Sequence, residues 1–186
     1  MARITVNTTG YQPHLYLTTQ VADGDLYDGT TSTQWVIDEN ALDTTCLQTI
    51  TVNNSTGIFS WTDFCSTDMQ KITTPADNSI STDIVIDATD FYGNSAAVDP
   101  SALFSGVNGL ASTKTYVQWV LVMNGGLDAA TVARAGAVDP DQPGRWYRGL
   151  GYITSVAPTV SPDAPVWVSP MEIAVSGDMT TGIVTS

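Results

Sequence analysis

The chain alternates between short apolar runs and polar, turn-rich segments, which is the pattern of a β protein. Apolar residues recur at every second position in Ile50–Val52 and in Ile84–Ala88, so one face of each strand points inward and the other outward. Runs of this kind predict strands at Arg3–Asn7, His14–Thr18, Gln34–Asp38, Leu47–Asn53, Ile58–Trp61, Ser81–Asp87, Thr115–Met123, Trp146–Val156 and Val166–Ser176. We therefore expect a mainly β protein, an antiparallel β-sandwich or barrel, formed as a single domain over residues 1–186.

The run Thr115–Met123, TYVQWVLVM, differs from the others because it is nearly continuous in apolar residues. A strand that faces water on one side alternates apolar and polar residues, whereas a strand covered on both sides does not need to. The pattern predicts a strand buried on both faces, in the core or under a neighbouring subunit.

One helix is predicted at about residues 99–111. Asp99 can cap its first turn, and Pro100 suits the first helical position. Gly106 and Gly109 should weaken it by about 1 kcal/mol each relative to Ala, so we expect a short helix stabilised mainly by packing across a sheet. A second, shorter candidate is Asp128–Ala137, DAATVARAGA.

Two long polar segments, Gln20–Ser32 and Asp63–Ser79, lack a strand pattern and are predicted to be exposed loops. Loops of this length in a compact domain tend to be functional, and in an assembling protein their function is subunit contact. The interface candidates that these segments supply are Asp23, Leu26, Tyr27, Phe64, Met69 and Ile72.

The chain is acidic and poor in charge. Charged residues make up 13%, and 19 acidic against six basic residues give a net charge of −13. Adhesive binding to nucleic acid needs clustered Lys and Arg, and an anionic membrane would repel this chain. The first ten residues, MARITVNTTG, carry no apolar core of signal-peptide length, so we expect synthesis in a cytosol, with Cys46 and Cys65 reduced.

Candidate chemistry is sparse. His14 is the only histidine, so any histidine-dependent catalytic arrangement depends on it, and we expect no enzyme and no cofactor. Asp23, Asp25 and Asp28 form an oxygen-rich loop that could bind calcium, but their spacing departs from the EF-hand pattern, and a solvated acidic loop is the preferred interpretation. The five Trp residues lie in or beside strand-like runs, where core packing is the usual role and a sugar-binding platform the less frequent one.

The C-terminal stretch Arg145–Gly182 resembles the closing hairpin of the major tail-tube proteins of long-tailed, siphovirus-type bacteriophages. The resemblance is carried by the Gly-rich run Gly149–Ser155, the polar connector Ala157–Ala164, and the strand Val166–Ser176 that ends at Gly177. It implies a virion protein, made in the host cytoplasm, whose copies form hexameric rings that stack into a tube. The implied partners are further copies, the tail initiator and terminator, and the tape-measure protein, with DNA passing through the lumen unbound.

Low charge with abundant Thr, Val and aromatic residues suits large subunit interfaces, and a surplus of carboxylates suits a channel wall to which DNA does not adhere. Some of the Asp residues are therefore expected to line the lumen. Two alternatives share this composition. One is a β-sandwich binding module for a carbohydrate or receptor, which an exposed row of aromatic residues would favour. The other is a capsid decoration or head-completion protein.

Overall fold

The computed structural model describes residues 13–19, 41–44, 47–61, 69–74, 77–123, 144–160, 162 and 166–184. Two helices and nine strands occur in this part of the chain: β1 His14–Thr18, β2 Leu42–Thr44, β3 Leu47–Asn53, β4 Gly57–Trp61, β5 Gln70–Thr74, β6 Ser79–Val85, α1 Ala88–Tyr92, α2 Ala102–Thr113, β7 Tyr116–Val122, β8 Gly144–Val156 and β9 Val168–Val184. The expected mainly β, antiparallel class is confirmed. The predicted strands Arg3–Asn7 and Gln34–Asp38, the loop Gln20–Ser32 and the helix Asp128–Ala137 lie outside the described residues.

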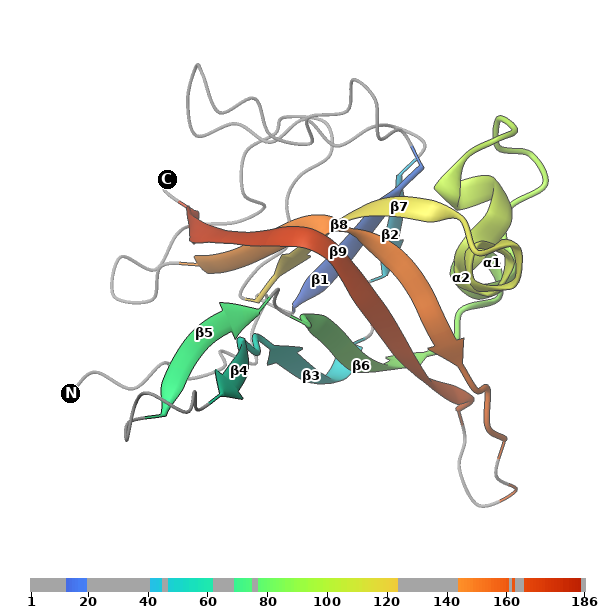
Figure 1. Ribbon diagram of the computed structural model, residues 1–186. Helices are drawn as coiled ribbons and strands as arrows, with labels where there is room; N and C mark the ends of the chain where they lie inside the picture. Colours follow the sequence, from blue (N-terminus) through green and yellow to red (C-terminus); the bar gives the residue numbers. More distant parts are fainter. Residues whose placement is uncertain are drawn as a thin grey trace.

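Seven strands form one antiparallel sheet in the order β2-β1-β7-β8-β9-β6-β3, and β4 and β5 form a separate two-stranded hairpin. The sheet curls, and α1 and α2 lie together at one side of it (Figure 1). The paired strands β8 and β9 join the two halves of this sheet. β8 also pairs with β7 of one half, and β9 also pairs with β6 of the other half. Register shifts between β8 and β9 mark bulges, which increase local twist and bend the strands.

The core fills the side of the sheet that the helices close. The core cluster includes the fully buried Leu15, Leu17, Trp119 and Leu121 of β1 and β7, and β6 and β9 add Ile80, Ile84, Met171 and Ile173. Val107 and Leu110 of α2 pack into the same cluster. β7 is buried at every position after Tyr116, which confirms the prediction from its continuous apolar sequence.

The predicted helix is confirmed, but its first residue was wrong. α2 begins at Ala102 because the Ser101 hydroxyl accepts a hydrogen bond from the Phe104 N–H, at 2.9 Å. Asp99 and Pro100 precede the helix, joined by a cis peptide bond. A side-chain oxygen at the cap satisfies one of the free N–H groups of the first turn, and Ser serves as well as Asp.

Glycine was expected only to weaken this helix, but Gly106 has a structural role in it. Its φ of 63° and ψ of 174° lie outside helical values, and the helix kinks there. A Cβ at Gly106 would lie 2.4 Å from the Gly93 nitrogen, and a Cβ at Gly93 would lie 2.1 Å from the Phe104 oxygen. The two glycines therefore allow the backbone after α1 to pass directly against α2.

Two more predicted boundaries were wrong. The last strand does not end at Gly177: this residue has a φ of 85° in an irregular stretch of the β8–β9 pairing, and β9 continues to Val184. The segment Asp63–Ser79 is not a loop throughout, because it contains β5 and the first residue of β6. The sequence of β5, QKITT, has one apolar residue, so its alternation is too weak to predict a strand.

Candidate interaction surfaces

The β4–β5 hairpin carries the largest group of exposed apolar side chains in the described part of the chain. We call residues 57–61 and 69–74 the arm. It projects at one end of the molecule, away from the helices (Figure 1). Its exposed apolar residues are Ile58 (62%), Phe59 (57%), Trp61 (41%), Met69 (62%) and Ile72 (53%). Contiguous exposed apolar side chains on a folded protein indicate an interaction site.

The register of the hairpin places Phe59, Trp61 and Ile72 on one face and Ile58 on the other. Phe59 lies opposite Ile72, Trp61 lies opposite Gln70, and the rings of Phe59 and Trp61 stack with centroids 5.9 Å apart. Lys71 is opposite Ser60, so it belongs to the other face of the strand pair. It is the only charged residue among the described residues of the arm.

The base of the arm is fastened to the seven-stranded sheet. The Ser55 N–H donates to Asn78 Oδ1 at 3.2 Å, and the Ser55 hydroxyl donates to the Asp77 carbonyl at 2.6 Å. Asn78 is 6% exposed, and its own carbonyl accepts a hydrogen bond from the Val175 N–H of β9 at 2.9 Å. The direction in which the arm projects is therefore set by contacts to the sheet.

We predict that Asn78→Ala loosens this base. Loss of the bond to the Ser55 N–H should lower the free energy of unfolding by about 1–2 kcal/mol and speed hydrogen exchange in the arm more than in β7. Urea unfolding combined with residue-resolved exchange measures both quantities. Asn53→Ala is the matched control, since Asn53 makes an exposed side-chain bond to Ser79. Equal changes in the two variants would contradict the assignment.

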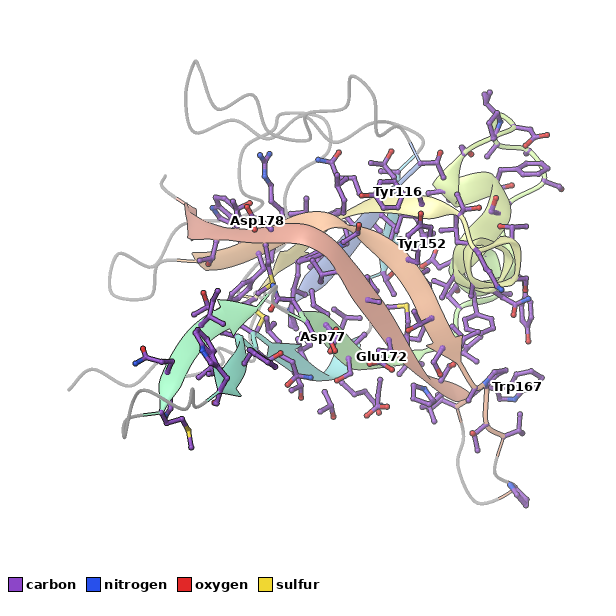
Figure 2. The ribbon with its side chains drawn as sticks, viewed as in Figure 1. Asp77, Tyr116, Tyr152, Trp167, Glu172 and Asp178 are labelled. Atoms are coloured by element: carbon purple, nitrogen blue, oxygen red, sulfur yellow. The ribbon has the colours of Figure 1, made fainter. Side chains whose placement is uncertain are left out.

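A second apolar surface lies where β8 and β9 reach their common end. We call it the tip; its exposed residues are Val160 (54%), Val166 (43%) and Trp167 (48%). A bridge between Thr159 and Val168 continues the pairing past β8, and the Trp167 carbonyl accepts a hydrogen bond from the Ile86 N–H at 2.9 Å. Figure 2 shows Trp167 at the end of the molecule away from the arm.

The outward side of β3, β6, β8 and β9 is polar. A shallow hollow of about 230 Å³ there is lined mainly by hydroxyl and carboxylate side chains: Thr49, Thr51, Ser81, Thr82, Asp83, Ser155 and Glu172, with Pro170 and Met171. No Lys or Arg is among these residues. We call this hollow, with its lining residues, the acidic face. Glu172, one of its two carboxylate residues, is labelled in Figure 2.

Aromatic side chains on the described surface do not form one row. Tyr116 and Tyr152 are neighbours on β7 and β8, with ring centroids 4.9 Å apart, and Figure 2 shows both well away from Trp167. Phe59 and Trp61 form a separate pair on the arm. The row that would favour a carbohydrate-binding module is therefore not found in the described residues.

The chain is similar to chains in three solved particle structures. One is the tail of an empty gene transfer agent particle (12% identity, 73% of this chain and 81% of the other, TM-score 0.46), and another is the native virion of such a particle (12%, 79% and 92%, 0.47). The third is the sheath–tube complex of an extracellular contractile injection system in its extended state (8%, 97% and 93%, 0.48). No family model and no curated protein sequence matches the chain.

The residues predicted as interface or site candidates have different outcomes. Met69 and Ile72 are exposed on the arm, as an interface requires. Asp23, Asp25, Leu26, Tyr27, Asp28 and Phe64, together with Cys46 and Cys65, lie outside the described residues. Within the described ranges, no three His, Cys, Asp or Glu side chains are placed to hold a metal ion. Neither described helix has the length and hydropathy to span a bilayer.

His14 Nδ1 lies 3.0 Å from Asp43 Oδ1 on the neighbouring strand, within hydrogen-bonding distance, and the His14 ring stacks on Tyr16. The contact with Asp43 joins β1 to β2, the strand at the edge of the sheet. Catalysis by a histidine–carboxylate pair needs a nucleophile or an activated water within reach. Among the described residues, His14 has only the Asp43 carboxylate as a hydrogen-bonding partner.

The carboxyl group of Asp90, in the first turn of α1, makes stability depend on pH. Burial, and then the carboxylates of Asp87 and Asp43, raise the pKa of the Asp90 carboxyl above its ordinary value. The folded protein therefore holds this proton more tightly than the unfolded chain does. The free energy of unfolding contributed by Asp90 is highest below the unfolded pKa and falls as pH rises through the folded pKa.

We predict that Asp90→Asn is more stable than the parent at pH 7, because it removes a carboxylate whose ionisation the fold opposes. The advantage should shrink as the pH falls to about 4, where the unfolded carboxyl also takes up its proton. Thermal unfolding followed by circular dichroism at several pH values measures the difference. A difference in Tm that does not change with pH, or a less stable variant at pH 7, would refute the role given to Asp90.

Proposed function

We propose that this chain is a structural protein of a phage-type tail, whose copies assemble into stacked hexameric rings that form a tube for DNA. The observation that carries the proposal is the arm, an apolar hairpin fixed at its base and exposed on both strands. In this proposal the protein has no catalytic residue and no cofactor, and it resides in the virion.

The arm has the properties of an assembly element. A two-stranded hairpin is at best marginally stable in water by itself. Phe59, Trp61 and Ile72 each stay largely accessible in the single chain, although burying such a side chain is worth about 1.5–3 kcal/mol. Association with another subunit supplies that burial.

The acidic face suits the wall of a DNA channel. Asp83 and Glu172 stand among hydroxyl groups, without a cation in the lining. Like charge prevents the phosphate backbone from binding, and short hydroxyl side chains leave few points of attachment. We assign this face to the lumen, in agreement with the expectation that carboxylates line it.

The C-terminal resemblance supports the same proposal. The run Gly149–Ser155 lies in β8, and the last strand is β9, so the resembling elements are the two central strands that join the halves of the sheet. The tail initiator, the terminator and the tape-measure protein are the proposed partners besides further copies.

Sedimentation velocity and negative-stain electron microscopy of the purified protein over a range of concentrations test the proposal. We expect rings or hollow tubes, which duplex DNA should not bind at physiological salt. Phe59→Ser with Trp61→Ser should raise the concentration needed for assembly at least tenfold. Tyr92→Ser, a change at a residue that is 52% exposed on α1, is the control and should leave assembly unchanged.

A chain that stays monomeric at high concentration and in the presence of a tail initiator would refute the proposal. Binding of the monomer to glycans, lost in the Phe59 and Trp61 variant, would then support the carbohydrate-binding module. The stacked pair of Phe59 and Trp61 is the observation that keeps this second candidate.

A further inference from the structure

We propose that a small hollow between β2 and α1 binds one divalent cation of the calcium type. The ligands from this chain are the hydroxyl of Thr44 and the carboxylates of Asp87 and Asp90, and water completes the coordination. The bound ion fastens β2, the short strand at the edge of the sheet, to the first helix. Nothing in this proposal depends on whether the chain assembles into a tube.

The hollow lies where β2, β6, α1 and α2 meet. Its apolar walls include Ile84, Phe91 and Val107, each at most 1% exposed. Its volume is about 20 Å³. A cavity needs roughly 10–15 Å³ on this measure to hold one water molecule, and a calcium ion is smaller than a water molecule. The hollow therefore has room for one such occupant.

Thr44 supplies the observation that points to a ligand. It is 3% exposed, and its Oγ1 has no hydrogen-bond partner among the described residues. Native proteins pair nearly all of their buried polar groups, because a buried hydroxyl without a partner is destabilising. An occupant of the hollow that Thr44 lines would provide the missing partner.

Two carboxylates line the same hollow without a cation beside them. Asp87 and Asp90 are three residues apart, a spacing that places side chains on one side of a helical turn. Asp87 Oδ1 caps α1 by accepting from the Thr89 N–H at 2.8 Å, which orients this carboxylate and leaves its Oδ2 without a hydrogen bond to a described residue. No Lys or Arg lines the hollow, and no salt bridge within the described ranges involves either aspartate.

A divalent cation suits these groups better than water does. Water can accept the proton of the Thr44 hydroxyl and donate to both carboxylates, but it leaves two like charges uncompensated beside apolar walls. Calcium binds roughly six to eight oxygen ligands in flexible geometry. The described residues bring no third carboxylate, thiolate or imidazole to the hollow. Asp87 is exposed, so solvent reaches the ion and supplies the remaining ligands.

Thermal unfolding with and without calcium tests the site. The parent protein in EDTA, titrated with CaCl₂ until the chelator is exceeded, should show a saturable rise in Tm. The rise should reach about 5–10 °C when free Ca²⁺ is about a hundredfold above its Kd, and isothermal titration calorimetry should give the same Kd. NaCl at the same ionic strength should not reproduce the rise, although it screens the net charge of −13.

Two conservative variants identify the ligands. Thr44→Val keeps the shape of the side chain and removes the unpaired hydroxyl. It should be at least as stable as the parent in EDTA and bind Ca²⁺ about threefold to tenfold more weakly. Asp87→Asn keeps a capping side chain and removes one charge, so it should weaken binding by about tenfold or more. Glu172→Gln, on the acidic face, is the charge-matched control and should bind as the parent does.

The acidic loop of Asp23, Asp25 and Asp28 is the competing calcium site. A response that is lost when these three residues are changed to Asn, and kept in Thr44→Val, overturns the assignment to the hollow. A parent Tm that Ca²⁺ does not raise also overturns it and leaves the hollow to water. Neither result bears on the proposed function, because assembly of the parent protein is measured separately.

Discussion

Gly106→Ala is expected to lower the free energy of unfolding by about 2–4 kcal/mol, the combined effect of a strained backbone and a steric clash. Gly106 has a φ of 63°, which side-chain-bearing residues rarely adopt, and an added Cβ would lie 2.7 Å from the Phe91 oxygen as well as 2.4 Å from the Gly93 nitrogen. Neither obstacle is a flexible side chain, so α1 and α2 would have to separate. Urea denaturation of the two proteins measures the loss.

Gly109→Ala in the same helix is the matched control. A Cβ at Gly109 meets only the Ser105 Cβ, at 3.2 Å, and the backbone there is helical. The usual gain of about 1 kcal/mol for replacing a helical glycine should then offset the tight contact, and stability should change little or rise. Similar losses in the two variants would show that the kink at Gly106 is not required.

The second large effect is expected for Trp119→Ala, a loss of about 3–5 kcal/mol from removing a buried aromatic side chain. Trp119 is fully buried on β7, and its ring occupies the space above Gly149 of β8, where a Cβ would lie 2.8 Å from Cζ2. The vacated volume lies between β7, β8 and β9, so the remaining side chains can close it only in part. The loss should appear as a lower urea midpoint, together with loss of blue-shifted tryptophan emission.

Trp167→Ala is the control for Trp119→Ala, because it removes the same type of side chain from an exposed position. Trp167 is 48% exposed at the tip, so its removal should change the stability of the single subunit by no more than about 0.5 kcal/mol. Equal effects of the two Trp substitutions on unfolding would contradict the description of the core.

Strands that cross the core were predictable from the sequence because burial leaves a direct pattern. The apolar run of β7 and the long run of β8 were placed within one or two residues of their observed limits. Elements stabilised by contacts far away in the sequence were not predictable. β2 has three residues, and it pairs with β1 across a long segment, so no local pattern identifies it.

Surfaces were predictable only in part. Met69 and Ile72 were identified as interface residues because apolar side chains in a polar segment are unusual, and both prove to be exposed. Trp61 was expected to pack in the core with the other Trp residues, because alternation within a strand does not tell whether a second layer covers it. The acidic face combines residues of four strands, and only the sheet order brings Asp83 and Glu172 to one side.

The hydrogen bond between Asn78 and Val175 has a consequence for biosynthesis. The arm leaves the ribosome long before β9, which supplies the N–H that holds the Asn78 carbonyl. Until then one of the contacts that orient the base of the arm is missing, and the tip, part of which is β9, is also unfinished. A nascent chain thus exposes an apolar hairpin whose direction is not yet fixed, and synthesis of β9 completes both the base of the arm and the tip. Assembly would then be restricted to finished subunits by the order of translation.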